Sequence, residues 1–125
     1  MTIIEAITRI DAVKPNTYQQ SEKVSWLSAL DGIIMREIIE THEGDSAEFN
    51  GYTVDTPLTT ALLVPEPYSE LYLYYLESKI DYWNGETKRF NNSSEMFNKA
   101  YSDYARWYNR NHTAKGTKFN FFGRG

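Results

Sequence analysis

The residues of this chain that could bind a metal ion lie close together near residue 40. Glu37, Glu40 and His42 supply two carboxylates and one imidazole. Carboxylate-bridged metal sites in helical bundles use Glu-x-x-His on two helices, which places both ligands on one helix face. Here the spacing is Glu40-x-His42, which places the two side chains on different faces. We therefore interpret these residues as a solvated helix end, and we expect no metal and no other cofactor.

The patterns of covalent and phosphate chemistry are missing from the sequence. The chain has no cysteine, and no serine lies in a Gly-x-Ser-x-Gly turn. Neither the Gly-x-x-x-x-Gly-Lys phosphate loop nor the Gly-x-Gly-x-x-Gly fingerprint occurs. The two histidines, His42 and His112, are expected at the surface. We predict that the protein is not an enzyme.

Aromatic and basic residues alternate between Tyr104 and His112. The aromatic rings could stack on the bases of a single-stranded nucleic acid while Arg106 and Arg110 contact phosphates. Packing of the tyrosines on a neighbouring helix is the competing interpretation, and a sequence pI of about 5.2 argues against a protein whose main task is to grip DNA. A small helical nucleic-acid-binding or regulatory protein that uses its basic C-terminal helix is therefore kept as the alternative function.

Charge is divided unevenly along the chain. Residues 1–87 contain fifteen Asp and Glu against five Lys and Arg, whereas residues 88–125 contain eight basic residues against two acidic ones. The formal net charge of −4 therefore describes a dipolar molecule. Opposite potentials steer encounters and fix orientation, so such a chain suits contact with copies of itself or with a fixed partner. We expect an assembly component.

Two amphipathic helices are predicted before residue 43. Isoleucines spaced three and four residues apart predict a helix over residues 2–13, and Lys14-Pro15-Asn16 ends it. Thr17 followed three residues later by Gln20 resembles a capping box, and an apolar stripe then predicts a second helix to about His42. The stripe consists of Val24, Leu27, Leu30, Ile34 and Ile38.

The helical periodicity fails between residues 43 and 67. Gly44, Asn50-Gly51 and three prolines punctuate an acidic run there, which lacks the regular aspartate spacing of a calcium loop. Loops of this length in a compact domain are usually functional or disordered, so we expect this one to make contacts on assembly. Its middle, from Phe49 to Val54, is also compatible with a small β-hairpin around Asn50-Gly51.

Two further helices are predicted in the aromatic-rich second half, where residues 68–108 hold twelve of the nineteen aromatic residues. Pro67 is a good first-turn residue for a helix that runs to Trp83, and Asn84-Gly85 ends or bends it. Alternating four- and three-residue spacing predicts a fourth helix over residues 86–111, which the polar patch 91–94 could break. Twelve aromatic residues exceed what one small core encloses comfortably, so we expect some to face a partner.

The fold class predicted from these elements is all-α. A small bundle of about four helices over residues 1–112 forms one domain, and residues 113–125 form a tail that cannot bury itself well. No segment approaches eighteen consecutive apolar residues, and no basic stretch followed by an apolar run begins the chain. We therefore expect neither a membrane-spanning segment nor a cleaved signal.

Several short segments follow one another in a recognisable order along residues 1–112. The segments are Lys14-Pro15-Asn16, Trp26 to Gly32, Arg36-Glu37, Leu63 to Tyr68, Glu70 to Tyr72, Tyr75 to Glu77, Ile80 to Tyr82, Asn84 to Glu86, Arg89 to Ser93, Phe97-Asn98 and Trp107 to Arg110. In their order and spacing they are similar to the small head-tail connector proteins of long-tailed bacteriophages, also called adaptor or head-completion proteins.

The resemblance implies a structural virion protein without catalysis. It implies an all-α subunit that forms a dodecameric ring under the portal protein at the DNA-exit vertex and extends the DNA channel toward the tail. Its partners would be copies of itself, the portal protein and a downstream neck or tail-completion protein. DNA would pass through the channel without sequence-specific binding, and no membrane would be involved. The protein would be assembled in the host cytoplasm and located in the neck of the virion.

Two sets of residues are assigned to these contacts. An acidic surface on one side of a subunit and a basic one on the other suit head-to-tail contacts that close into a ring. The predicted portal-binding residues combine cations with aromatic anchors and are Arg106, Arg110, Lys115, Lys118, Phe119, Phe121 and Phe122. The predicted subunit interface combines loop residues with tyrosines and consists of Glu43, Asp45, Glu48, Phe49, Tyr52, Asp55, Tyr72 and Tyr75.

Overall fold

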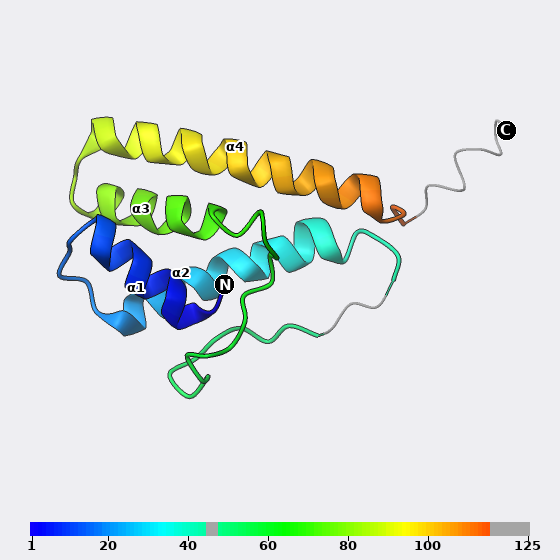
Figure 1. Cartoon of the computed structure of the whole chain (residues 1–125), viewed down its shortest axis with the longest axis horizontal. Coiled ribbons are helices and arrows are strands. Elements are labelled where there is room, and N and C mark those ends of the chain that lie inside the picture. The colour runs from blue at the N-terminus through cyan, green and yellow to red at the C-terminus, as the bar shows by residue number, and fades with distance from the viewer. Residues whose placement is uncertain (45–47, 116–125) are drawn as a thin grey trace, which may run out of the picture.

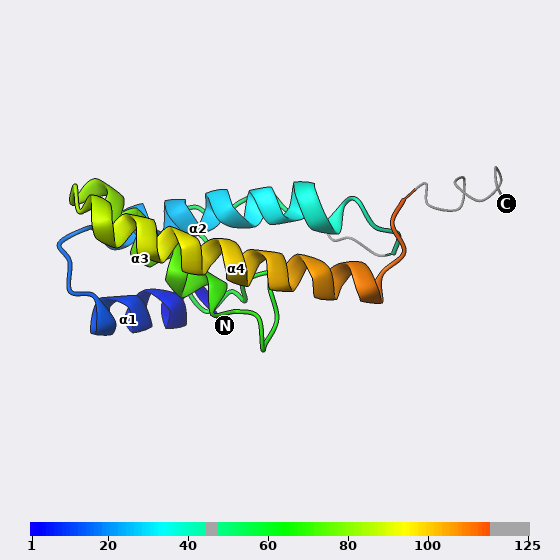
Figure 2. The same ribbon diagram turned by 90° about the horizontal axis from the view of Figure 1, so that it is seen from above.

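The computed structural model describes residues 1–44 and 48–115, and these residues form a layered bundle of four α-helices (Figures 1 and 2). α4 lies on α3, and α3 lies on a layer formed by α1 and α2. Seen from above, α1 and α2 flank the α3–α4 pair on opposite sides. The predicted all-α bundle is confirmed. The helices are α1 (Ile3–Val13), α2 (Gln20–Ile34), which continues into a π-helical turn η1 (Met35–Ile39), α3 (Leu71–Trp83) and α4 (Thr87–Asn111).

α1 begins with a capping box that the sequence interpretation placed elsewhere. The backbone N–H of Glu5 donates to Thr2 Oγ1 at 3.2 Å, and the N–H of Thr2 donates to Glu5 Oε1 at 2.8 Å. This reciprocal pair satisfies two of the N–H groups that a helix start leaves free. The capping box predicted at Thr17 and Gln20 is wrong, because α2 follows Gln19 and has no side-chain cap.

Residues 58–62 of the long loop run along the start of α1. The N–H groups of Ile3 and Ile4 donate to the carbonyls of Thr60 and Leu58 at 3.0 and 2.9 Å. The β-hairpin considered around Asn50-Gly51 does not form, since residues 48–70 contain no strand and the Tyr52 N–H donates to Ser28 Oγ of α2 at 2.9 Å. The loop therefore bonds to α1 and α2 and forms turns of its own, such as the bond from the Thr56 N–H to Thr53 O at 3.1 Å.

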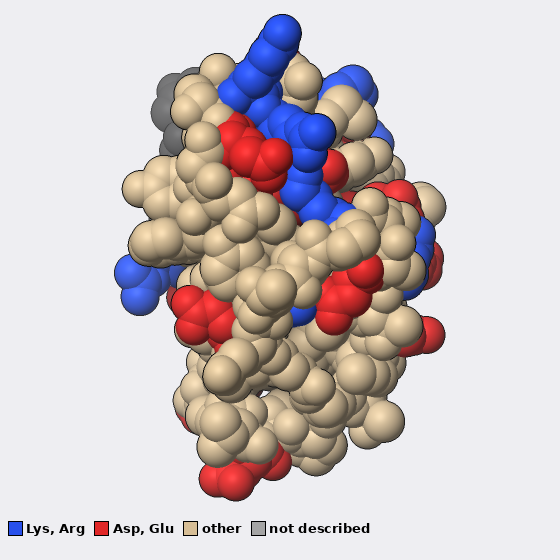
Figure 3. Space-filling view, turned by 90° about the vertical axis from the view of Figure 1, so that its left-hand side faces the viewer, with Lys and Arg blue, Asp and Glu red and all other residues tan. Residues whose placement is uncertain are grey.

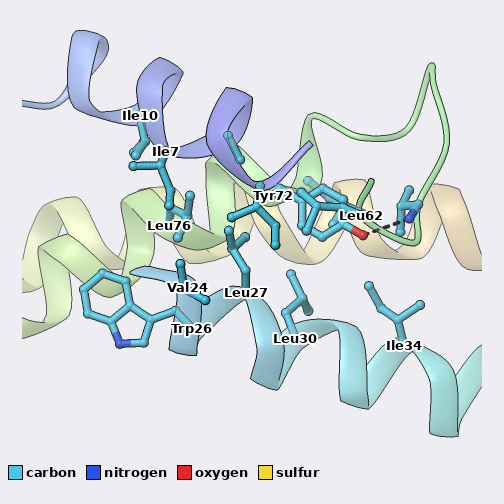
Figure 4. Packing of buried hydrophobic residues seen from close by; sticks show 14 of the residues in the cluster. Ile7, Ile10, Val24, Trp26, Leu27, Leu30, Ile34, Leu62, Tyr72 and Leu76 are labelled. Carbon is cyan, nitrogen blue, oxygen red and sulfur yellow. Dashed lines mark hydrogen bonds between the residues drawn. The ribbon is translucent and has the colours of Figure 1, made fainter. Parts of the chain in front are cut away.

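The hydrophobic core lies between α3 and the α1–α2 layer (Figure 4). Leu27 and Leu76 are fully buried within it, and burial of such a side chain contributes about 1.5–3 kcal/mol. α4 adds only Tyr104 to the buried cluster and otherwise packs on α3 with half-buried aromatic rings. The members drawn with labels in Figure 4 are Ile7, Ile10, Val24, Trp26, Leu27, Leu30, Ile34, Leu62, Tyr72 and Leu76.

The predicted second helix changes its geometry near its end. α2 stops at Ile34, and the π-helical turn η1 follows, in which the Glu40 N–H donates to Met35 O at 2.8 Å. Single π-turns inside helices are frequent at functional sites. The carbonyl of Ile38 lies at this helix end, where backbone carbonyls lack helical donors, and it accepts from Thr41 Oγ1 at 2.7 Å.

α3 and α4 form an antiparallel pair joined by a short turn. α3 begins at Leu71, so the predicted start at Pro67 is wrong, and Pro67 lies in the turns before the helix. The connecting turn contains Gly85 at φ +73°, a conformation that side chains with a Cβ rarely adopt. α4 continues through residues 91–94 without a break, because Ser93 is buried and donates to Asp81 of α3.

Candidate functional site

Asp31 of α2 is the buried anchor of the long loop. Its carboxylate accepts hydrogen bonds from Tyr72 Oη at 2.6 Å and from Tyr52 Oη at 2.5 Å. The backbone N–H of Leu63 donates to the same carboxylate at 3.1 Å. Tyr72 Oη in turn accepts from the Val64 N–H at 2.8 Å, the bond drawn in Figure 4. One carboxylate therefore holds two tyrosines and the loop backbone against α2.

This arrangement corrects the assignment of Tyr72 to the subunit interface. Tyr72 is 0% exposed and lies among the core side chains of the subunit, so it offers no surface to a neighbouring copy. The assignment rested on the pattern of closely spaced aromatic residues in the second half of the chain, which exceed what one small core encloses comfortably. That pattern cannot reveal a buried acceptor on a different helix, which is what allows a tyrosine hydroxyl to be enclosed.

Burial makes the charged form of Asp31 less favourable than it is in water. Burial raises the pKa of Asp31 above its ordinary value, although the hydrogen bonds from Tyr52, Tyr72 and the Leu63 N–H act in the opposite direction. Burial raises the pKa of both tyrosines far above the ordinary value of a tyrosine, and the charge of the Asp31 carboxylate is the second cause of this shift. The two hydroxyls therefore remain protonated donors, and the centre serves to fix the loop.

The loop residues of the predicted subunit interface remain accessible in part. Phe49 packs edge-on against Tyr52 with ring centroids 5.1 Å apart, and both side chains are half-buried. The carboxylates are distributed along the loop instead of gathered at one point, and those exposed in the described residues are Glu43, Glu48 and Asp55. The structure thus brings together Phe49 and Tyr52, the two aromatic loop residues of the predicted subunit interface.

The two remaining members of that set differ in position. Tyr75 of α3 is half-buried and lies against Phe97 of α4, with ring centroids 5.2 Å apart. Its ring therefore already has a partner within the subunit, and only its outer part faces solvent. Asp45 lies outside the described residues.

Two of the predicted portal-binding residues are exposed near the end of α4. Arg106 and Arg110 both face solvent, but the Asp103 carboxylate accepts from Arg106 Nη2 at 2.6 Å and from Lys99 Nζ at 3.2 Å. Asp103 therefore offsets part of the positive charge on this face. Because both pairs are exposed, each contributes little to stability.

The last described residues, 113–115, lie beside the end of η1. The Lys115 N–H donates to Thr41 O at 2.9 Å, and the Glu43 N–H donates to Thr113 O at 2.7 Å. These bonds clamp residues 113–115 onto residues 41–43, and the Lys115 side chain remains exposed. The other predicted portal-binding residues, Lys118, Phe119, Phe121 and Phe122, lie outside the described residues.

His42 is buried behind this clamp. The surface position predicted for it is wrong, because only 5% of the residue is exposed. Its Nδ1 lies 2.6 Å from Ile38 O, and its Nε2 lies 2.7 Å from Asn109 Oδ1 of α4. The Tyr108 ring packs edge-on against it and stacks on the ring of His112 with centroids 3.8 Å apart. His42 therefore joins the end of η1 to the end of α4.

The Glu37, Glu40 and His42 side chains do not converge on a metal site. Both ring nitrogens of His42 face oxygen atoms of other residues, and Glu37 accepts from Tyr101 Oη at 2.8 Å. Residues 1–44 and 48–115 contain no group of three or more His, Cys, Asp or Glu side chains that could hold a metal ion.

A second buried carboxylate, Asp81, joins three helices at the other end of the α3–α4 pair. Its Oδ2 accepts from Ser93 Oγ of α4 at 2.8 Å. Its Oδ1 lies 2.5 Å from Nζ of Lys14, the residue directly after α1. The two groups form an ion pair, but the contact does not have the geometry of a hydrogen bond. The exposed fractions of the Asp81 and Lys14 side chains are 1% and 14%. The pair fixes the end of α1 to α3.

Tyr82, Trp83 and Phe90 form an aromatic group, the aromatic cap, at the turn between α3 and α4, in which Tyr82 and Trp83 are exposed and Phe90 is half-buried. The Tyr82 ring lies 5.2 Å from Trp83 and 5.6 Å from Phe90, measured between centroids. Tyr82 is 57% exposed and Trp83 is 59% exposed. A shallow groove of about 310 Å³ runs beside it, with Gly85 in its wall. This surface has the size and chemistry of a contact site.

Figure 3 looks onto the end of the molecule that carries the aromatic cap. Lys and Arg side chains gather along its upper part, the α4 side, and uncharged residues form most of the rest. Lys88 and Arg89 are the exposed bases in the first turn of α4. The sequence interpretation missed the cap because it treated Trp83 only as the last residue of its helix. The signal was Asn84-Gly85, which ends α3 directly after Trp83.

Comparison with known proteins gives no match, since no family model fits the chain and neither a curated protein nor a solved structure is similar enough to count as a relative. None of the helices in the described part of the chain is both long and apolar enough to cross a membrane. Function is therefore argued from the residues of the chain itself.

Proposed function

We propose that this chain is a structural virion protein, a head-tail connector subunit that forms a ring under the portal and extends the DNA channel toward the tail. The observation that carries the proposal is the aromatic cap, where Tyr82 and Trp83 remain more than half exposed beside a complete core. Exposed aromatic surface on rigid elements is typical of protein–protein contacts. The order of segments that resembles the connector family supports the same conclusion.

In this proposal the subunits contact each other through opposite charges. The exposed loop carboxylates Glu43, Glu48 and Asp55, with Phe49 and Tyr52, form one side of the contact, and the basic face of α4 forms the other. Such a head-to-tail contact closes into a ring where the rotation between neighbours permits. Tyr72 is not part of this surface, and Tyr75 contributes only its exposed edge.

The portal would bind at the end of the subunit where α4 finishes. Arg106, Arg110 and Lys115 are exposed there, and residues 116–125 continue from the same point. Three phenylalanines in that segment, Phe119, Phe121 and Phe122, would serve as anchors, and Lys118 would add a steering charge.

The proposal is tested by the native mass of the purified protein, alone and mixed with the portal protein of the same phage. A complex that contains the connector in the same copy number as the portal ring is the expected result. Deletion of residues 116–125 keeps the 113–115 clamp, and it should abolish portal binding without changing the helical circular dichroism. Retained portal binding by this variant would contradict the assignment of the tail, and a full-length protein that ignores the portal would contradict the function.

The nucleic-acid-binding alternative rests on the exposed bases of α4. Arg110 and Lys88 face solvent on this helix, whereas Asp103 lies between two further bases and offsets their charge. Affinity that depends on phosphate contacts falls steeply with salt, because bound counterions are released. A monomer that binds single-stranded DNA with such a salt dependence, and that does not bind portal protein, would favour this alternative.

A further inference from the structure

The aromatic cap is a surface that the subunit itself leaves without a cover. The cap lies where α3 ends and α4 begins, and its rings contact one another while Tyr82 and Trp83 remain 57% and 59% exposed. Large aromatic side chains in such a position are the usual anchors of protein contacts, since they bury much area and lose little side-chain entropy. The question is therefore which segment covers the cap.

Residues 116–125 have the composition that such a cover requires. Phe119, Phe121 and Phe122 fall within four positions of the sequence, and the segment contains no acidic residue. Aromatic rings pack favourably on other aromatic rings in offset or edge-on arrangements, which matches the open rings of Tyr82 and Trp83. The chain thus carries one exposed aromatic surface and, outside the described residues, one aromatic-rich segment.

The segment cannot reach the cap of its own subunit. α4 contains 25 residues, so its two ends are about 37 Å apart. The cap lies at its first turn, whereas Lys115 is clamped to Thr41 beyond its last turn (Figure 1). Phe122 follows Lys115 by seven residues, which span at most about 24 Å when fully extended. Among the copies of residues 116–125, it is therefore that of another subunit that can cover the cap.

We propose that, while no portal protein is present, residues 119–122 of one copy dock on the aromatic cap of a second copy. This inference rests on the self-association in the proposed function and adds a second contact, between tail and cap, to the contact between opposite charges. The contact joins opposite ends of two identical subunits, so it is heterologous and can be repeated from copy to copy. The portal would then compete with the cap for the same phenylalanines. Docking of a subunit on the portal would therefore release its tail from the cap of the neighbouring copy.

The test uses full-length protein and complementary variants. Trp83→Ala removes the most exposed ring of the cap but leaves the tail. The triple change of Phe119, Phe121 and Phe122 to Ala removes the tail anchors but leaves the cap. We expect each variant to need at least about ten-fold higher concentration for half association in sedimentation velocity than the unchanged protein. Ile33→Ala, which removes a 44% exposed side chain of α2, is the matched control and should associate normally.

Mixing the two variants separates this contact from other kinds of association. The mixture retains one intact cap and one intact tail, so it should form a 1:1 complex and nothing larger. A mixture that stays monomeric, or single variants that associate like the unchanged protein, would overturn the inference. Portal binding by the Trp83→Ala variant is measured separately: it should persist, because the tail is intact. If the unchanged protein itself does not bind the portal, the proposed function is rejected instead.

Discussion

Asp31 and Asp81 are both buried carboxylates that join two layers of the bundle, but their partners differ in charge. Asp81 has the Lys14 ammonium 2.5 Å away and one hydroxyl donor, Ser93. Asp31 has only neutral donors among the described residues, namely two tyrosine hydroxyls and one backbone N–H. A buried charge is stabilised far better by an opposite charge than by neutral dipoles.

The difference shows two ways of fixing a segment that has little core of its own. At Asp81 the ion pair fixes the end of α1 through a long-range charge interaction, and loss of either partner leaves an unpaired charge in the interior. At Asp31 the carboxylate fixes the loop through donors that are themselves buried, and the raised pKa shows that the charge is only partly compensated. The first centre should depend most on its partner, and the second on its own protonation.

The largest effect is expected from Lys14→Met. The change leaves the Asp81 charge buried without its cation, and breaking such a pair costs about 3–5 kcal/mol in the free energy of unfolding. Urea denaturation at neutral pH measures the loss. The double change Lys14→Met with Asp81→Asn should recover part of it, since the unpaired charge is then removed.

The surface pair Arg9–Glu70 is the control for that experiment. Its atoms lie 2.8 Å apart, but both side chains are 51% exposed. Arg9→Met should therefore cost no more than about 0.5 kcal/mol. Equal losses for Lys14→Met and Arg9→Met would contradict the assignment of Asp81 as a charge that needs a partner.

A smaller effect is expected at the Asp31 centre from Tyr72→Phe. The change removes a donor to Asp31 and leaves the buried Val64 N–H without its acceptor, which together should cost about 2–3 kcal/mol. Tyr52→Phe removes a donor at a half-buried position that water can reach, so about 1 kcal/mol is expected. The ratio of the two losses in urea denaturation is the measurement, and a larger loss for Tyr52→Phe would reverse the proposed roles.

The comparison also shows what the sequence can predict. The apolar spacing of α1 and α4 predicts both helices to within about one residue, because that spacing is a local property of each helix. Asp31 was not singled out, since its partner Tyr72 is far away in the sequence and no short pattern joins them. Its place inside an apolar stripe was the available signal.

The candidate surfaces were predicted less well than the helices. Exposure of Trp83 and burial of His42 depend on which helix covers each end of α3 and α4, and periodicity alone does not contain that information. Glu43, Glu48 and Asp55 of the loop and the two α4 arginines Arg106 and Arg110 are exposed as expected, because charged side chains are rarely buried without a partner.

His42 extends the comparison to a buried polar group with uncharged oxygen partners. His42→Leu keeps much of the packing against Tyr108 but removes the contacts to Ile38 O and Asn109. Thr41 still donates to Ile38 O, and the exposed Asn109 can bind water, so the expected loss is about 1–2 kcal/mol. Thermal unfolding followed by circular dichroism measures it. A loss as large as that of Lys14→Met would show that charge is not what separates these centres.

The smallest effect expected is a change of the unfolding free energy with pH that is caused by the titration of Asp31. Because burial raises its pKa, the folded protein binds this proton more tightly than the unfolded chain does. The stabilising contribution is therefore complete below the unfolded pKa of about 3.9 and is lost as the pH rises through the higher folded-state pKa. Asp31→Asn removes this dependence.

The measurement is the difference in unfolding free energy between the unchanged protein and the Asp31→Asn variant, taken from about pH 3.5 to pH 7. Other carboxylates titrate in both proteins and cancel in this difference. The unchanged protein should lose stability relative to the variant as the pH rises. Asp55→Asn on the exposed loop is the control and should give a flat difference. A difference that moves in the opposite direction for Asp31→Asn would mean that the tyrosine hydroxyls compensate the Asp31 charge fully, and the contrast with Asp81 would then disappear.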